Sequence, residues 1–207
     1  MSETKGAIAS EHIGIGSSLA RNRLVVPVNQ REYAWQKKHV TDLLQDLSKA
    51  ISSNKSTYFL GTVVLTVGSD EVWAVADGQQ RLATITMLLA AIRDYYFTRP
   101  EDTLLVEHIE RSYLFIIDPE QRKIVPRLTL NVQDNEFFRK RIVVRPDDKD
   151  RKIRASHESH ERIEEAAKLV AAHVKNLIKP HRETDRSDYL NRWVKYIDSF
   201  AKVVLLN

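Results

Sequence analysis

The chain has 207 residues, of which 43% are hydrophobic and 29% charged, and it carries a net charge of +4 at pH 7. This composition is typical of an ordinary globular protein, and the small positive charge permits nucleic acid as a partner without requiring it. The absence of cysteine excludes thiolate metal sites, cysteine nucleophiles and disulfides. No apolar run reaches the roughly 20 residues of a membrane span, and the N-terminus lacks a signal peptide. We therefore expect a cytoplasmic protein that makes no use of a membrane.

The first hundred residues predict alternating strands and helices. Apolar, β-branched runs indicate strands, and apolar side chains at a spacing of three or four residues indicate helices. The expected strands are residues 23–28, 58–67 and 72–76, and the expected helices are residues 37–51 and 82–96. Residues 13–19 predict a short strand or a helical turn, and residues 68–70 predict a hairpin turn.

From Asp102 onward the pattern is mostly helical. The expected helices are residues 102–113, 134–139, 156–178 and 187–200, and the expected short strands are residues 127–130 and 201–207, with a charged loop at 145–155. We place a domain boundary at Arg99-Pro100, between an α/β half (1–99) and a mainly helical half (100–207). The apolar end of the chain indicates that a further C-terminal region follows.

The segment Asp77-Gly78-Gln79-Gln80-Arg81 forms a polar turn between an expected strand and an expected helix. Backbone N–H groups and the helix dipole at such a turn attract anions, above all phosphate. Arg81 in the first helical turn opposes the dipole unless an anion lies between them. The alternative is that Asp77 caps the helix and Gly78 makes the turn without any ligand. This segment alone leaves both interpretations open.

A second polar stretch follows the expected strand 23–28. Arg31 is suited to bind a phosphate with two hydrogen bonds, and Tyr33 and Trp35 are suited to stack on a base. The alternative is that both aromatic side chains pack beneath the first long helix while Arg31 pairs with Glu32 or Asp42. Taken alone, this stretch favours the alternative.

The sequence shows few other signs of a metal site or of a known catalytic motif. His157 and His160 lie near a helix start without a third ligand, so we expect no protein-built metal site. The sequence contains no Walker A loop, no GxGxxG segment and no HExxH segment. Asp77 and Glu32 are the carboxylates beside the two polar turns, and either is a candidate for holding Mg²⁺ against a phosphate.

Three segments together resemble the N-terminal domain of GmrSD-type restriction proteins. They are Val26–Trp35 with the pattern Pro-x-x-Gln-Arg-x-Tyr-x-Trp, Tyr58–Gly61 with Phe-Leu-Gly, and Asp77–Thr84 with Asp-Gly-Gln-Gln-Arg. The family shows these motifs in this order and at similar spacing. Two positions depart from it, because Ala83 stands where Thr is usual and Asn29 where an aromatic residue is common. The family's Asn-x-Arg-Gly segment and HNH nuclease module are absent from these 207 residues.

The resemblance implies an α+β fold similar to ParB and sulfiredoxin, with a small mixed sheet and helices, followed by a mainly helical half. It also implies a role in defence against foreign DNA, with nucleotide hydrolysis in this domain. Carried over residue by residue, it assigns catalysis to Asp77 and Arg81. It assigns nucleotide binding to Gly78, Gln79, Gln80, Arg81, Gln30 and Arg31, and DNA binding to Tyr33, Arg31 and Trp35.

The expected ligands are therefore a nucleoside triphosphate with Mg²⁺, modified or foreign DNA, and a C-terminal nuclease region or partner subunit. We expect the chain itself to cut no DNA, because it lacks a nuclease motif. The alternative function is a DNA-binding sensor that reads modified DNA without turnover. A third interpretation, in which the Asp77 turn is purely structural, stays open.

Overall fold

The computed structural model describes residues 10–67 and 72–206. The strands are β1 (Ser10–Gly14), β2 (Arg23–Val25), β3 (Tyr58–Val67), β4 (Val72–Asp77), β5 (Phe115–Asp118), β6 (Lys123–Pro126), β7 (Leu128–Thr129) and β8 (Ala201–Leu206). The α-helices are α1 (Ile15–Arg21), α2 (Lys37–Ser52), α3 (Gln79–Phe97), α4 (Thr103–Ile109), α5 (Val132–Phe138), α6 (Glu158–Ile178) and α7 (Arg186–Ser199). Short 3₁₀ or π-helical turns are η1 (Pro100–Asp102), η2 (Glu110–Leu114), η3 (Arg139–Val143), η4 (Lys149–Lys152) and η5 (Glu183–Asp185).

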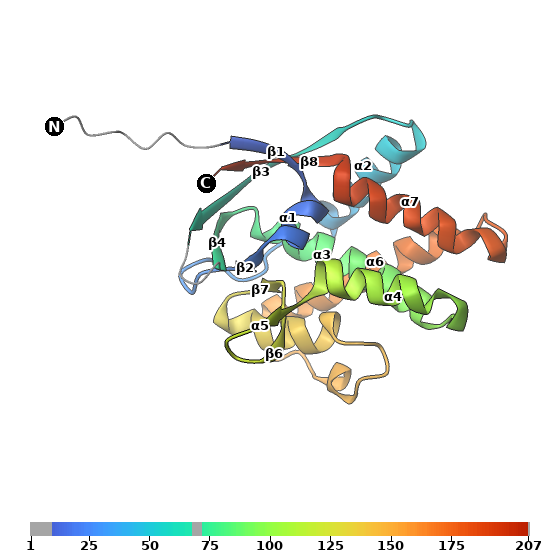
Figure 1. The fold of residues 1–207 in the computed structure, drawn as a ribbon. Helices are drawn as coiled ribbons and strands as arrows, with labels where there is room; N and C mark the ends of the chain where they lie inside the picture. Colours follow the sequence, from blue (N-terminus) through green and yellow to red (C-terminus); the bar gives the residue numbers. More distant parts are fainter. Residues whose placement is uncertain (1–9, 68–71, 207) are drawn as a thin grey trace.

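A mixed sheet of six strands, in the order β1-β8-β3-β4-β2-β7, forms one side of the molecule (Figure 1). β3 and β4 pair antiparallel, as two strands joined by a hairpin do. The hairpin turn expected at residues 68–70 lies outside the described residues. β2 pairs parallel with β4, and Leu24 lies opposite Trp73. The α+β class expected from the sequence is therefore confirmed.

Strands from both sequence halves share this sheet. β8 inserts between β1 and β3, and β7 forms the edge beside β2. Figure 1 shows β1 and β8, from opposite ends of the described chain, lying side by side. One hydrophobic core also takes residues from both halves. The boundary at Arg99-Pro100 therefore separates two stretches of sequence that fold onto one sheet and one core.

Helix α3 runs through the centre of this core. Leu82, Ile85, Leu88 and Ile92 are fully buried, and α3 packs against α4 and α6. A helix that is apolar on nearly every face is stable only when it is surrounded by protein. Its position fixes the turn at its N-terminus with respect to the sheet. No helix within the described residues is long and apolar enough to cross a membrane.

Two local features differ from the sequence-based expectation. A hairpin formed by β5 and β6 was not expected, although Asp118-Pro119 opens its turn and Arg122 lies in that turn with a φ of 52°. Its paired Ile117 and Ile124 are both exposed, so the hairpin lacks the buried face that gives a strand its alternating pattern. Strand β2 also ends at Val25, before Pro27, which has no N–H for a sheet hydrogen bond.

Candidate functional site

The two polar turns meet at one edge of the sheet. Because β2 and β4 are parallel neighbours, their carboxyl ends lie at the same edge, where ligands bind in many α/β proteins. A cavity of about 410 Å³ opens there. It is lined by Gln30, Arg31, Trp35, Asp77, Gly78, Gln79, Gln80 and Arg81. Residues of both polar turns therefore line one cavity.

The N-terminus of α3 carries no side-chain cap. Gly78 is the N-cap residue, with a φ of 91°, and no side chain accepts a hydrogen bond from the first helical N–H groups. Asp77 is instead the exposed last residue of β4. The interpretation that Asp77 caps the helix is therefore wrong. A β-carbon on Gly78 would lie 2.9 Å from Val63 Cγ2, so glycine is required for both conformation and space.

The Gln80 side chain connects the polar stretch that follows β2 to helix α3 through hydrogen bonds. Its side chain is 6% exposed, and its amide nitrogen donates to the Glu32 carbonyl at 3.0 Å. Its amide oxygen accepts from the N–H of Ala34 at 2.8 Å and from that of Trp35 at 3.2 Å. A buried amide that satisfies three backbone groups specifies one loop conformation. The Gln80 amide therefore fixes the backbone of the loop that borders the site, and it does not project toward a ligand.

Two further glutamines connect the same segments. Gln79 is 8% exposed and donates to the Arg31 carbonyl at 3.0 Å. Gln30 donates to the Ala76 carbonyl at 3.1 Å. The amide groups expected to bind nucleotide are thus engaged in holding the two turns together. They fix the backbone from which Arg31 projects.

Arg81 lies half-buried beside the Phe-Leu-Gly strand. It donates to the Thr62 carbonyl at 3.1 Å, and it has no ion pair among the described residues. Burial lowers the pKa of Arg81, and the nearby charge of Asp77 opposes that shift. Arginine nevertheless stays protonated in proteins. The site therefore holds a partly desolvated cation that an anion would stabilise.

Arg31 is exposed at the mouth of the same cavity. It forms no ion pair with any carboxylate that the structure describes, and in particular none with Glu32 or Asp42. Arg31 also borders a second hollow of about 540 Å³. That hollow is lined by Val28, Gln30, Arg31, Glu32, Ala34, Asn131, Val132, Gln133 and Arg162. The guanidinium is therefore available to ligands on either side.

The two aromatic residues of this stretch differ in access. Tyr33 is 2% exposed, its hydroxyl is hydrogen-bonded to that of Thr84 at 2.9 Å, and burial raises its pKa. The expectation that Tyr33 stacks on a base does not fit this position, because neither face of the ring is accessible. Trp35 is half-buried, lines the first cavity and stacks on His39 with ring centroids 6.0 Å apart.

Residues beyond position 100 complete the support of the site, and the sequence analysis missed them. Asp134 is 1% exposed and accepts a 2.6 Å hydrogen bond from the Tyr33 N–H. Asn131 caps α5 by accepting from the Asp134 N–H, and its amide donates to the Gln30 carbonyl at 3.3 Å. The Asn-x-x-Asp spacing is a helix-start signal, but nothing local shows that it faces the Tyr33 stretch.

The described residues contain no group of three or more His, Cys, Asp or Glu side chains suited to hold a metal ion. His160 stacks on Phe137 with ring centroids 4.3 Å apart, and its Nε2 lies 3.0 Å from the Gln133 carbonyl. Asp77 is the one carboxylate among the residues that line the first cavity.

The chain matches the family model described as the N-terminal domain of the GmrSD restriction endonuclease, over residues 14–206. No curated protein matches the chain. The match includes all three motifs, two of which line the first cavity. The chain therefore belongs to the family of GmrSD restriction endonuclease N-terminal domains and forms part of a restriction protein.

Proposed function

We propose that the cavity between Arg31 and Arg81 binds the phosphates of a nucleoside triphosphate, as a step in sensing foreign DNA. The carrying observation is the convergence of two arginines on one cavity, with no carboxylate paired to either among the described residues. Two like charges at one site repel each other unless an anion joins them. A phosphate between the two guanidinium groups would relieve that repulsion.

Each lining group has a role that its position supports. The phosphates would rest on the N–H groups that follow Gly78, since no side chain occupies them. Arg81 and Arg31 would neutralise the phosphate charge from opposite sides. Trp35 borders the cavity with an aromatic ring suited to a base. Catalysis of this class depends on positioning and electrostatic stabilisation rather than on a covalent intermediate.

Asp77 suits a magnesium-bound nucleotide. Mg²⁺ at phosphate sites is held through one or two carboxylates, substrate oxygens and water, so a single aspartate is sufficient protein ligation. Asp77 is exposed at the cavity and makes no ion pair among the described residues. Bound there, the ion would supply charge neutralisation at the phosphates. Asp77 would otherwise orient the attacking water.

A second candidate function is a DNA sensor without turnover. The hollow on the other side of Arg31 supports it, because Val28 and Val132 are 78% and 77% exposed there, beside Arg162. Exposed apolar side chains next to arginines suit contact with a nucleic acid base and its phosphates. Both candidate functions use Arg31, but only the first includes hydrolysis of a nucleotide.

Calorimetry with ATP, GTP, CTP and UTP, each with Mg²⁺, tests the proposal on the whole chain. We expect Arg31→Ala to weaken binding by about 1.5–3 kcal/mol, as for loss of a charge-assisted hydrogen bond. Arg154→Ala is the matched control, because Arg154 is exposed and lines none of the cavities described here. Equal binding by both variants, or no binding of any triphosphate, would refute the proposal. Release of inorganic phosphate would support the enzyme, and binding without release of phosphate would support the sensor.

A further inference from the structure

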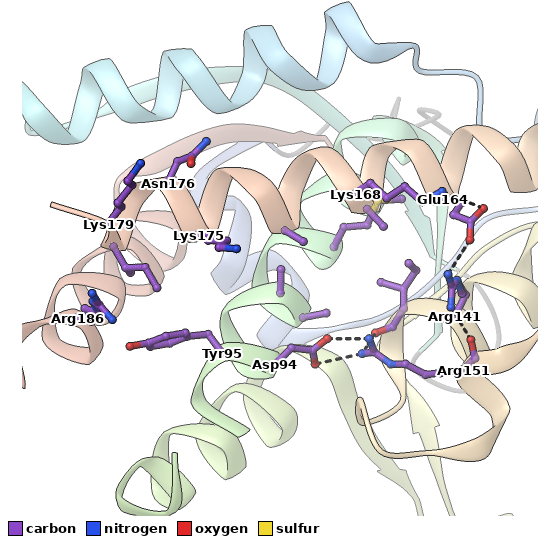
Figure 2. A pocket seen from close by; sticks show the side chains of 17 residues that line it. Asp94, Tyr95, Arg141, Arg151, Glu164, Lys168, Lys175, Asn176, Lys179 and Arg186 are labelled. Carbon is purple, nitrogen blue, oxygen red and sulfur yellow. Dashed lines mark hydrogen bonds and ion pairs between the residues drawn. The ribbon is translucent and has the colours of Figure 1, made fainter. Parts of the chain in front are cut away.

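A cavity of about 840 Å³ lies between α3 and α6, away from the site described above (Figure 2). Its lining on α3 begins at Met87 and reaches Tyr95, whereas Arg81 lies in the first turn of the same helix. Met87 lies about 9 Å from Arg81 along the helix axis at 1.5 Å per residue, and the two cavities share no lining residue. The cavity is therefore a separate place on the molecule, and neither the proposed nucleotide site nor the sheet uses it.

The floor of this cavity is apolar and consists mainly of alanine side chains. It is formed by Met87, Ala90, Ala91, Ala167, Ala171 and Ile178. Alanine side chains on two packed helices leave space that longer side chains would fill. A volume of this size, with an apolar floor and polar or charged side chains around it, is within the range of small-molecule sites.

At one end of the cavity the charges are paired. Arg151 Nη1 lies 2.7 Å from Asp94 Oδ2, and Arg141 Nη2 lies 2.6 Å from Glu164 Oε1. Figure 2 shows these two ion pairs next to each other at this end of the cavity. Both carboxylates on the lining are thus neutralised by arginines. Lys168 shares Glu164 with Arg141, so every cation of the lining at this end has a carboxylate partner.

The opposite end is basic. Lys175 and Lys179 extend from α6, and Arg186 lies at the start of α7. None of the three forms an ion pair among the described residues. The Tyr95 ring lies beside this end, and its buried hydroxyl has no hydrogen-bond partner. Three cations on one side of an apolar floor attract an anionic group and leave room for an apolar body.

We propose that this cavity binds a small organic anion with an apolar, planar body, its acidic group at Lys175, Lys179 and Arg186 and its body on the alanine floor. Carboxylates, sulfonates and phosphates share the required chemistry. The proposal does not depend on nucleotide binding at Arg31. It adds a second ligand site to the same long helix.

Dye binding to the whole chain tests the proposal. Anilinonaphthalene sulfonate is an aromatic anion that fluoresces in apolar sites, and phenylnaphthylamine is its neutral counterpart. We expect the sulfonate to bind with a defined stoichiometry and the neutral dye to bind more weakly. The variant Lys175→Glu/Lys179→Glu should weaken binding of the sulfonate by roughly tenfold or more, because two cations beside the acidic group become anions that repel it.

Matched variants separate this site from others. Lys55→Glu/Lys149→Glu makes the same charge change at exposed positions outside the cavity and should bind the dye as the unaltered chain does. Ala171→Trp should block binding by filling the floor, and Arg31→Ala should leave it unchanged. Circular dichroism and thermal unfolding check that each variant is folded.

Three results would overturn the proposal. The first is equal affinity for the charged and the neutral dye, which would show an apolar surface without anion selectivity. The second is equal loss of binding in the control pair. The third is a dimer in sedimentation that dissociates when Lys175 and Lys179 are replaced, which would show that a second copy covers the groove. Displacement of the dye by inorganic phosphate, nucleotides or aromatic carboxylates then identifies the acidic group.

Discussion

The Arg81 guanidinium packs directly over the backbone of Gly61. A β-carbon at Gly61 would lie 3.0 Å from Arg81 Nη2, and Gly61 has a φ of 108°, which side-chain-bearing residues rarely adopt. The pairing of β3 with β8 shifts register beside Gly61, between Phe59 and Gly61. The Phe-Leu-Gly motif therefore contacts the Asp-Gly-Gln-Gln-Arg motif directly, through Gly61 and Arg81.

Replacing Gly61 with alanine should displace Arg81 from the cavity. We expect the free energy of unfolding to fall by about 1–3 kcal/mol, because the new residue is strained at positive φ. Binding of a nucleoside triphosphate should fall as well. Denaturant unfolding and calorimetry measure the two effects on the same sample. Unchanged affinity in a folded Gly61→Ala variant would show that the contact does not position Arg81 for ligand.

Removing the Gln80 side chain should loosen the loop that carries Arg31. Gln80→Ala leaves the N–H groups of Ala34 and Trp35 without their acceptor. We expect a loss of about 2–3 kcal/mol in the free energy of unfolding. Gln45→Ala, at an exposed position of α2, is the control and should cost under 1 kcal/mol. Hydrogen exchange of residues 32–35 should accelerate only in Gln80→Ala.

Arg93 is a fully buried cation at the centre of the helical layer. It pairs with Glu110 at 3.0 Å and donates to the carbonyls of Val143 and Val144. Arg93→Met should lower the free energy of unfolding by about 3–5 kcal/mol, since the buried partners lose their donor. The exposed Arg154→Met should have little effect. A stable Arg93→Met variant would show that this network contributes specificity rather than stability.

Acid should weaken the fold through Glu110. Burial raises the pKa of Glu110, but ion pairs with Arg145 and Arg93 outweigh burial and hold that pKa below its usual value of 4.5. A carboxyl group with a lowered folded-state pKa stabilises the fold above its unfolded pKa, and this contribution is lost as pH falls through the folded-state pKa. The free energy of unfolding should therefore decrease below about pH 4.5. Glu110→Gln should be less stable at pH 7 and show a smaller decrease in acid. An identical pH dependence in both proteins would contradict this assignment.

Local sequence alone determined the longest elements and the place of the motifs. The strand 58–67 and the helices near residues 37–52 and 158–178 follow from β-branched runs and helical spacing, which act within a few neighbouring residues. The position of the Asp77 turn directly after a strand also followed from the local sequence. Elements that depend only on neighbouring residues can be predicted from a local sequence pattern.

Only the tertiary structure decided which side chains face the ligand cavity. Gln79 and Gln80 turn toward the loop, Tyr33 is enclosed against Thr84 and Asp134, and Arg31 is left exposed. It also decided that β8, at the far end of the chain, completes the sheet between β1 and β3. The physical reason is that burial and hydrogen-bond partners come from residues far away in the sequence, as for Ser10 and Leu206. A sequence pattern gives the type of each element, whereas long-range packing selects the partner of each side chain.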